Sequence, residues 1–274
     1  MSKRSGPLAP GVAFITGGAR GLGNAIAVSF AKEGARGIVL VDIQDEKAFQ
    51  EGKRKVEEIG TECLTIFADV TKEADVERAV AEAVAKFGRI DYAANFAGIS
   101  GTSDTISDMN LELWQKAQDV NATGILVATK YEMRQMMKQD SIDGVEKGRI
   151  PQSGSIINCA SVNSLQTMPS TAAYTASKHA CAGITKAAAL EGRPHNIRVN
   201  AVSPGFLLTD LVKPIEQTDA GKILWDGFVQ RQGRVALFEE VGDAVVLMSI
   251  PRMSLVNGHN LFIDNGFTIN EGTT

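Results

Sequence analysis

The chain has 274 residues, of which 44% are hydrophobic and 22% are charged, and its formal net charge is −4. It is long enough to bury a large core, and its slight negative charge gives no reason to expect nucleic acid or an acidic membrane as a partner. The three cysteines are scattered and the three histidines show no metal-ligand spacing, so we expect a reducing compartment and no metal site. No signal-type or bilayer-length apolar run is seen, which favours a cytoplasmic protein.

Short β-rich segments alternate with longer helical patterns along the chain. The predicted strands are residues 12–16, 37–42, 63–67, 90–95, 154–161, 197–203 and 260–264. Most are continuous apolar runs, which is typical of parallel strands buried on both faces. The alternation predicts an α/β fold: one Rossmann-type, doubly wound domain over residues 1–274, with a seven-stranded parallel sheet flanked by helices on both faces.

The first predicted strand runs into a glycine-rich turn, TGGARGLG, at residues 16–23. Glycine permits positive φ and a close approach of the backbone to a ligand. The helix that begins near Leu22 offers free N–H groups and a dipole to a phosphate. The spacing differs from the usual GxGxxG, and a plain tight turn is the alternative. Its position between the first strand and the first helix favours a dinucleotide site.

The charges beside this turn bear on the choice of cofactor. Asp42 ends the second strand, nineteen residues after Gly23. A carboxylate there accepts hydrogen bonds from the adenosine ribose and repels a 2′-phosphate, which favours NAD. Arg20 favours NADP instead, because a guanidinium pairs well with phosphate. We predict NAD, since an uncompensated carboxylate beside a phosphate dianion is the larger penalty.

Two segments exceed ordinary loop length. Residues 140–153 lead from a helix into a strand, at the sheet edge opposite the one where ligands bind, and we interpret them as a surface excursion. Residues 205–233 follow a strand directly and are rich in apolar side chains, which makes them a candidate substrate lid. Ordinary amphipathic helix packing is the alternative explanation for those apolar side chains.

Tyr174 and Lys178 lie four residues apart in the alanine-rich stretch AAYTASK. On the helix predicted for residues 172–191 they share one face and can touch. Taken alone, the pair also suits a plain helix surface with two amphipathic side chains. Its meaning therefore depends on the rest of the chain.

Seven fragments together resemble the short-chain dehydrogenase/reductase family over nearly the whole chain. They are TGGARGLG at 16–23, ADV at 68–70, NFAG at 95–98, DVNATG at 119–124, NCASVNS at 158–164, AAYTASK at 172–178 and SPGFLLT at 203–209. NFAG departs from the family's Asn-Asn-Ala-Gly at Phe96, which leaves the strand-supporting role of Asn95 intact. Each fragment is weak alone, and their common order makes the resemblance specific.

The resemblance implies that the catalytic residues are Asn121, Ser161, Tyr174 and Lys178. Tyr174 would act as general acid/base, and Lys178 would favour its phenolate and hold the nicotinamide ribose. Ser161 would hold the substrate oxygen, and Asn121 would anchor a water that connects the lysine to solvent. Considered singly, Ser161 would be a strand-end serine that caps a turn, and Asn121 a helix hydrogen-bonder.

The predicted cofactor-binding residues come from the glycine turn, the ends of the following strands and the Pro-Gly motif. Asp69 is expected near the adenine amino group and Thr209 at the nicotinamide carboxamide. The full set is Gly17, Gly18, Arg20, Gly21, Leu22, Gly23, Asp42, Ile43, Asp69, Val70, Asn95, Ala97, Gly98, Tyr174, Lys178, Pro204, Gly205, Leu207 and Thr209.

The residues that flank this set are mostly uncharged, so we hypothesise a mid-sized, mainly apolar secondary alcohol or ketone as substrate. The predicted substrate residues are Ser100, Ser161, Asn163, Met168, Tyr174 and Phe206. Further candidate pocket residues are Ile99, Val162 and Leu207, with Leu211, Val212, Ile215, Leu224, Trp225 and Phe228 in the lid. Cys159 is interpreted as core packing rather than as a redox residue.

The helix at 172–191 is rich in alanine and glycine, and in the resembled family this helix packs against its symmetry mate. We therefore predict a homotetramer, with a dimer next. The predicted function is an NAD(P)-dependent oxidoreductase acting on alcohols or ketones. The alternative is a non-redox protein of the same fold, such as a cofactor-bound regulator or an isomerase or cyclase that uses the same pocket.

Overall fold

The computed structural model describes residues 7–141, 150–209 and 218–270, and its central sheet confirms the predicted fold class. Seven strands pair in parallel in the order β3-β2-β1-β4-β5-β6-β7. Their bounds are β1 Val12–Thr16, β2 Gly37–Asp42, β3 Glu62–Phe67, β4 Tyr92–Asn95, β5 Gly154–Cys159, β6 Ile197–Pro204 and β7 Asn260–Ile263.

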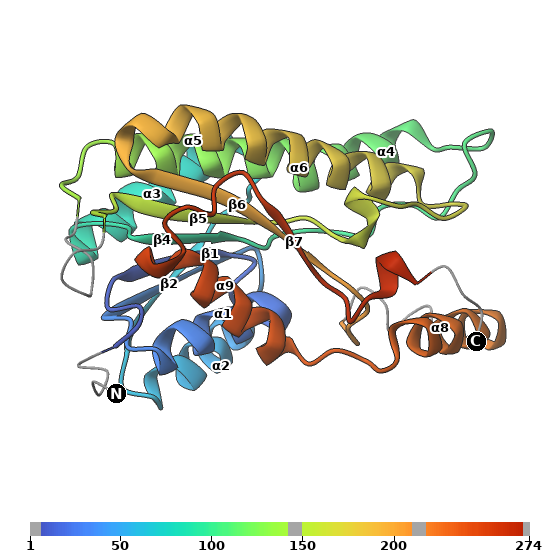
Figure 1. Cartoon of the computed structure of the whole chain (residues 1–274), viewed down its shortest axis with the longest axis horizontal. Helices are drawn as coiled ribbons and strands as arrows, with labels where there is room; N and C mark the ends of the chain where they lie inside the picture. The colour runs from blue at the N-terminus through green and yellow to red at the C-terminus, as the bar shows by residue number, and fades with distance from the viewer. Residues whose placement is uncertain (1–6, 142–149, 210–217, 271–274) are drawn as a thin grey trace.

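Helices cover both faces of the sheet (Figure 1). One layer holds α1 Gly21–Lys32, α2 Glu46–Glu57 and α9 Phe238–Ser249. Helix α1 packs against both α2 and α9. The other holds α3 Glu73–Phe87, α4 Leu111–Gln118, α5 Gly124–Met136 and α6 Ala172–Gly192. Helix α8, Asp219–Gln232, stands apart from both layers beyond the ends of β6 and β7. None of the described helices has the length and apolar character to cross a membrane.

Strand β1 shows why the strands read as unbroken apolar runs. Ala13 and Ile15 point into one hydrophobic cluster, on the side of α1, α2 and α9. Val12 and Phe14 point into a second cluster on the opposite side of the sheet. All four are fully buried, because successive strand residues face opposite layers and both layers are covered.

The strand order reverses between β1 and β4, which opens a crevice at the carboxyl ends of these strands. Thr16 and Asn95, the last residues of β1 and β4, are partners in register there. Every segment predicted to bind the cofactor follows a strand that ends at this same edge, and this edge therefore holds the candidate site.

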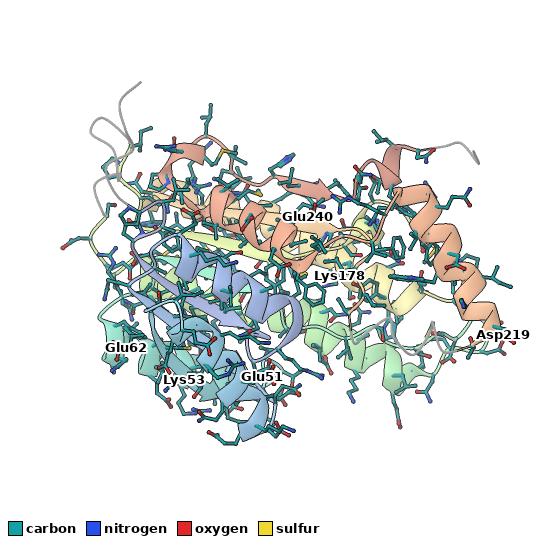
Figure 2. All side chains as sticks on the ribbon, turned by 90° about the horizontal axis from the view of Figure 1, so that it is seen from below. Glu51, Lys53, Glu62, Lys178, Asp219 and Glu240 are labelled. Atoms are coloured by element: carbon teal, nitrogen blue, oxygen red, sulfur yellow. The ribbon has the colours of Figure 1, made fainter. Side chains whose placement is uncertain are left out.

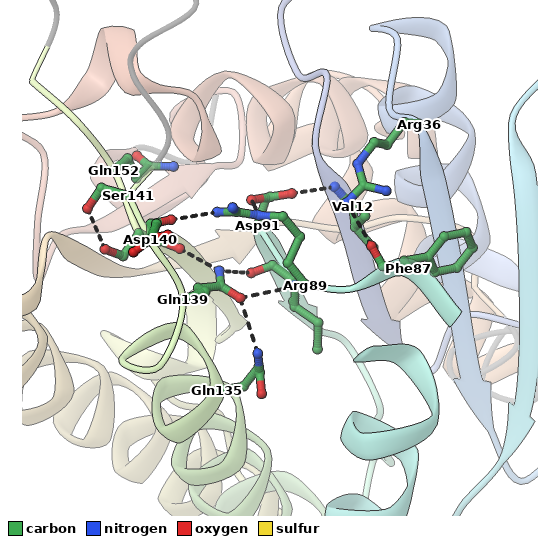
Figure 3. A network of polar contacts seen from close by, with 12 residues as sticks. Val12, Arg36, Phe87, Arg89, Asp91, Gln135, Gln139, Asp140, Ser141 and Gln152 are labelled. Atoms are coloured by element: carbon green, nitrogen blue, oxygen red, sulfur yellow. Dashed lines mark hydrogen bonds and ion pairs between the residues drawn. The ribbon is translucent and has the colours of Figure 1, made fainter. Parts of the chain in front are cut away.

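The opposite edge holds the described ends of the predicted surface excursion (Figure 3). Gln139 donates hydrogen bonds to the carbonyls of Ile90 and Ser153 at 2.6 and 2.7 Å, and the hydroxyls of Ser141 and Ser153 are 2.7 Å apart. Arg89 donates to the carbonyl of Asp140 at 3.1 Å. These contacts fasten both ends of the excursion to the start of β4 and β5. Residues 142–149 lie outside the described residues.

Two predicted strand ends differ from the structure by two residues, and the start of β3 and the ends of β6 and β7 differ by one. β4 begins at Tyr92 rather than residue 90, and the backbone N–H of Ile90 donates to the side chain of Gln139 instead of to a strand. β5 ends at Cys159 rather than at residue 161. Ser161 keeps an extended backbone but caps the 3-10 turn Val162–Ser164 instead of pairing with β6.

Candidate active site

The glycine-rich turn has the geometry of an anion site. Gly21 has φ +56°, and a Cβ built on it would meet no atom within 4 Å, so the outer side of the turn is open. A Cβ on Gly23 would lie 2.1 Å from the carbonyl oxygen of Gly17, so only glycine lets α1 start this close to β1. Arg20, the residue before α1, makes no side-chain cap of that helix. The amides of its first turn are thus left for a ligand.

The acidic residues predicted to meet the adenosine lie at the ends of β2 and β3. Asp42 accepts from the backbone N–H of Ala19 at 3.1 Å and of Ile43 at 2.8 Å, which fixes its carboxylate beside the glycine turn. Asp69 accepts from the backbone N–H and the hydroxyl of Thr71 at 3.0 and 2.7 Å. Each carboxylate keeps further lone pairs free for hydroxyl or amino donors.

Asn95, the last residue of β4, is fully buried and supports the candidate site through side-chain hydrogen bonds. Its amide nitrogen donates to Glu132 at 2.9 Å and to Asn158 at 3.0 Å. The hydroxyl of Thr16 accepts from the backbone N–H of Phe96 at 3.2 Å and bridges the ends of β1 and β4. The Phe96 side chain, which departs from the family motif, packs against the cluster under α1 and α9.

Lys178 is buried, with only 3% of its surface exposed, and its ammonium is 5.5 Å from the centre of the Tyr174 ring. Figure 2 labels Lys178 near the middle of the view. Among the described residues it makes one hydrogen bond, donating to the carbonyl oxygen of Cys159 at 2.7 Å. Burial opposes its charge, but the ionised forms of Cys159, Tyr174 and Cys181 outweigh burial and raise the pKa of Lys178. Two of its three donors therefore remain for a ligand.

Asn121 lies in a π-helical turn, Asp119–Thr123, between α4 and α5. Its side chain accepts from the backbone N–H of Ile99 at 2.9 Å and donates to the carbonyl of the same residue at 2.8 Å. It also donates to the hydroxyl of Ser177, 3.1 Å away. A Cβ on Gly98 would lie 3.2 Å from the oxygen of Asn121 and 3.8 Å from the nitrogen of Lys178, so the structure brings these two side chains to one spot.

Ser161 and Cys159 have different parts in this arrangement. The Ser161 hydroxyl accepts from the backbone N–H of Asn163 at 3.2 Å, so the serine does cap a turn. Within the described chain that hydroxyl acts only as an acceptor, which leaves its proton for another oxygen. Cys159 contributes its carbonyl oxygen to Lys178, and burial raises the pKa of its thiol. The expectation that both residues lie on one strand is wrong, because β5 has ended before Ser161.

Comparison with known proteins identifies the family. Residues 17–268 match the family model described as enoyl-(acyl carrier protein) reductase. The short-chain dehydrogenase anuF of Penicillium roqueforti is 38% identical over 272 residues, which covers 94% of this chain and 96% of that protein. The chain belongs to the short-chain dehydrogenase/reductase family.

Two further relatives of this short-chain dehydrogenase/reductase bear on its chemistry. The mitochondrial borneol dehydrogenase of Lavandula x intermedia is 35% identical over 263 residues, covering 95% of this chain and 92% of that protein. The crystal structure of NAD+-bound xylitol dehydrogenase superposes with a TM-score of 0.83 at 29% identity, covering 94% of this chain and 99% of that one. The chain thus shares its fold with an oxidoreductase that binds NAD+.

The structure brings only some of the predicted substrate residues of this short-chain dehydrogenase/reductase into contact with the elements of the site. Asn163 is buried and donates to the Thr175 hydroxyl of α6 at 3.1 Å, which ties the segment after Ser161 to the tyrosine helix. Met168 is half-buried in the loop before α6, whereas Ser100 is exposed. Phe206 is half-buried and stacks on Phe228 of α8 with ring centres 4.2 Å apart.

The candidate lid is described for its helical part. Trp225 is buried and Phe228 half-buried, and both contact the Phe206 ring. Leu224 is 49% exposed and belongs to the outer side of α8. The predicted lid residues Leu211, Val212 and Ile215 lie outside the described residues.

A hollow of about 630 Å³ lies on the side of α6 away from Lys178. Its apolar lining includes Ile106, Leu111, Trp114, Ala172, Ala176 and His179. None of the predicted substrate residues lines it. A hollow of this size would suit a ligand by volume, but it does not reach Ser161 or Lys178, and we do not assign it to the substrate.

Sequence reasoning missed three residues that support the site: Ser177, Glu132 and Gln232. Ser177 directly precedes Lys178 and holds Asn121. Glu132 is fully buried against Asn95, on the face of α5 that also buries Ala128, Met133 and Met136. A carboxylate on that apolar helix face was a signal in the sequence. Gln232 offered no such signal, because Phe206 and Asn265, the residues that it joins, lie 26 and 33 residues away in sequence.

Proposed function

We propose that this protein is an NAD-dependent oxidoreductase that interconverts mid-sized, mainly apolar secondary alcohols and ketones. One observation carries the proposal: a buried ammonium, Lys178, lies beside the Tyr174 ring and has donors to spare. A buried cation whose hydrogen-bond donors are not all used lowers the stability of a fold, but its spare donors can bind a ligand in an active site. The names of the relatives, among them a borneol dehydrogenase, support the substrate class.

The glycine turn and strand ends fit a dinucleotide. The free amides at the start of α1 would hold the pyrophosphate, and Asp42 would accept from the adenosine ribose hydroxyls. A carboxylate held at that point by two backbone N–H groups would repel a 2′-phosphate, so we propose NAD over NADP despite the nearby Arg20. Lys178 would donate its remaining protons to the nicotinamide ribose, and Thr209 would meet the carboxamide.

The bound nicotinamide supplies or accepts the hydride. Tyr174 takes the hydroxyl proton of an alcohol, or gives its own to a ketone, as general base or acid. The Lys178 ammonium lies close enough to stabilise the phenolate that this requires. Ser161 donates its free hydroxyl proton to the substrate oxygen and orients it. Asn121 holds both backbone groups of Ile99 beside the lysine, where a water would link the ammonium to solvent.

The test is a panel of secondary alcohols and ketones, assayed by nicotinamide absorbance with NAD and NADP side by side. We expect turnover with NAD, and we expect Tyr174→Phe to lower kcat by roughly 10³-fold or more while the Kd for NAD stays within about twofold. Near-normal turnover by this variant would reject the acid/base assignment. Tight NAD binding with no turnover across the panel would instead favour the non-redox alternative.

We also propose that the chain forms a homotetramer. The hollow beside α4 and α6 supports this, since it lies over Ala172 and Ala176 of α6 and leaves Ile106 and Leu111 largely exposed in one chain. Sedimentation at micromolar concentration measures the state, and a monomer there would overturn the proposal.

A further inference from the structure

Helix α8 is joined to the turn after β6 by one buried side chain, Gln232. Only 1% of this residue is exposed. Its carboxamide oxygen accepts from the backbone N–H of Phe206 at 2.7 Å, and its carboxamide nitrogen donates to the carbonyl of the same residue at 3.0 Å. The side chain therefore pairs with Phe206 in both directions, as a neighbouring strand would. It donates also to the carbonyl of Arg234 at 2.8 Å.

The neighbouring residues leave room for this carboxamide. A Cβ on Gly205 would lie 2.1 Å from the Gln232 oxygen, so a side chain at position 205 would displace the amide. Asn265, after β7, donates to the backbone carbonyl of Gln232 at 2.7 Å. Three segments that are distant in sequence, after β6, at the end of α8 and after β7, thus meet at Gln232.

A second contact links the same two segments. The Phe206 ring stacks on Phe228 and meets Trp225 edge-on with centres 6.1 Å apart. Phe267 closes the cluster from the C-terminal side, 4.9 Å from Phe206. The backbone of Phe206 and its side chain are both held by α8 or by residues beside it. Any displacement of α8 must therefore move Phe206 or break two buried hydrogen bonds.

We propose that Gln232 is a positioning residue that couples helix α8, on the substrate side, to the turn that receives the nicotinamide. The inference rests on the proposed function, in which Pro204 to Thr209 meet the nicotinamide. Cofactor bound at this turn stabilises the position of α8 that these contacts define, and α8 in that position stabilises the turn that binds the cofactor. Such a linkage is reciprocal, so a change at either end is measurable at the other.

The chemistry requires an amide at this position. Glutamate has the same shape but, when ionised, offers only acceptors, so it would place a buried charge against the carbonyl of Phe206. When protonated, its hydroxyl regains one donor and restores part of the pairing. Leucine fills a similar volume but leaves the N–H of Phe206 unsatisfied, while the carbonyl of Phe206 keeps only the backbone N–H of Ala236 at 3.1 Å.

The experiment uses the full-length protein and three variants: Gln232→Glu, Gln232→Leu and the control Gln230→Glu. The control adds the same charge to the same helix at an exposed position two residues earlier. Calorimetry gives the Kd for NAD at several pH values. Amide hydrogen exchange, with and without NAD, reports on residues 219–232 and 205–209 separately.

We expect the Kd of Gln232→Glu to exceed that of the parent protein by roughly 10-fold or more near pH 8, and the gap to narrow as the pH falls towards about 6. The parent protein and Gln230→Glu share one pH profile. In the ligand-free protein, Gln232→Leu speeds exchange in both segments together. NAD slows exchange in α8 of the parent protein but not in α8 of Gln232→Leu.

Unchanged exchange of residues 219–232 in Gln232→Leu, or equal pH profiles for Gln232→Glu and Gln230→Glu, would overturn the coupling. A parent protein that binds neither NAD nor NADP would overturn the proposed function and the cofactor end of the linkage. Exchange in the ligand-free variants still decides, in that case, whether Gln232 joins α8 to the turn.

Discussion

Two buried cations at opposite edges of the sheet show how differently this chain uses charge. Arg198, near the start of β6, is 6% exposed and Lys178, beside the end of β5, is 3% exposed. Arg198 donates hydrogen bonds to five acceptors: Gln152, Ser155 and the carbonyls of Met248, Ile250 and Val256. Lys178 donates to one described acceptor, the carbonyl of Cys159. The two side chains are similarly buried, but Arg198 makes many more hydrogen bonds than Lys178 does.

The difference separates structure from function. The guanidinium of Arg198 donates from all three of its nitrogens and fastens β5, β6 and the segment after α9 together, and its pKa is lowered to about 10 by burial. A buried ammonium with unused hydrogen-bond donors stabilises the fold by less than the free energy that its burial costs. That imbalance is expected where a ligand completes the site, and the first two predictions test it from each side.

The largest expected effect is on catalysis, from Lys178→Met. Methionine fills a similar volume without charge, so we expect kcat/KM to fall by roughly 10³-fold or more, while the free energy of unfolding stays within about 1 kcal/mol of the parent or rises. Steady-state kinetics and thermal unfolding in the same buffer measure both. A variant that unfolds readily but turns over normally when folded would place Lys178 with the structural cations.

The opposite result is expected for Arg198→Met. It removes the described donor of the Met248 carbonyl and of the Gln152 side-chain oxygen, and one of two donors at the carbonyls of Ile250 and Val256. We therefore expect a loss of roughly 3–5 kcal/mol of stability and a fall in Tm of about 10 °C. Activity per folded molecule should stay within about twofold, because Arg198 lies at the edge away from the site. Arg198→Lys retains the charge but lacks the planar set of guanidinium donors, so we expect it to lose less stability than Arg198→Met. Full stability of Arg198→Met would contradict the comparison.

A buried carboxyl, Glu132, lies between these extremes. One of its oxygens accepts from Asn95 at 2.9 Å, and the other has no hydrogen-bond partner among the described residues. Burial raises its pKa from the ordinary 4.5 to about 8, opposed in part by the bond from Asn95. The protonated form is therefore the one that the folded state prefers at neutral pH.

This shift has a definite sign in the stability of the protein. Between about pH 4.5 and 8 the folded state binds more protons at Glu132 than the unfolded state, so stability falls as the pH rises through this window. Glu132→Gln cannot ionise, and we expect it to remove roughly 2–4 kcal/mol of that decline. Denaturant unfolding of both proteins at pH 5, 7 and 9 measures the difference. Parallel curves for the two proteins would show that Glu132 stays ionised, or stays solvated, in the folded state.

How much of this could be predicted from the sequence depends on how local each feature is. The strands were predictable because β1 and its neighbours are buried on both faces, which imposes an apolar residue at nearly every position. The end of β5 was not, because Ser161 keeps an extended backbone and leaves the sheet through a side-chain hydrogen bond. The hydrophobic periodicity of a sequence does not reveal such a bond.

The candidate site divides in the same way. The spacing of Tyr174 and Lys178 follows from one helix and could be read directly, but the acceptor of Lys178 is a backbone carbonyl, which every residue has. Gln232 meets Phe206 and Asn265 across 26 and 33 residues of sequence, and nothing local marks such a pairing. Motifs therefore locate the chemistry, while the contacts that hold it in place appear only with the fold.

The smallest expected effect tests how tightly the edge around Lys178 is packed. Gly98→Ala adds a methyl group 3.2 Å from the Asn121 oxygen, so that side chain must shift by a few tenths of an ångström, whereas Lys178, 3.8 Å away, stays in ordinary van der Waals contact. We expect a loss of about 1 kcal/mol in stability and roughly a tenfold loss in kcat/KM, because Asn121 is displaced from its hydrogen bonds to Ile99 beside the lysine. Gly183→Ala, on α6, adds the same methyl where no atom lies within 4 Å, and should leave kcat/KM unchanged. Equal kinetics for the two variants would mean that Asn121 tolerates this movement, and that tight packing beside Lys178 has no catalytic role.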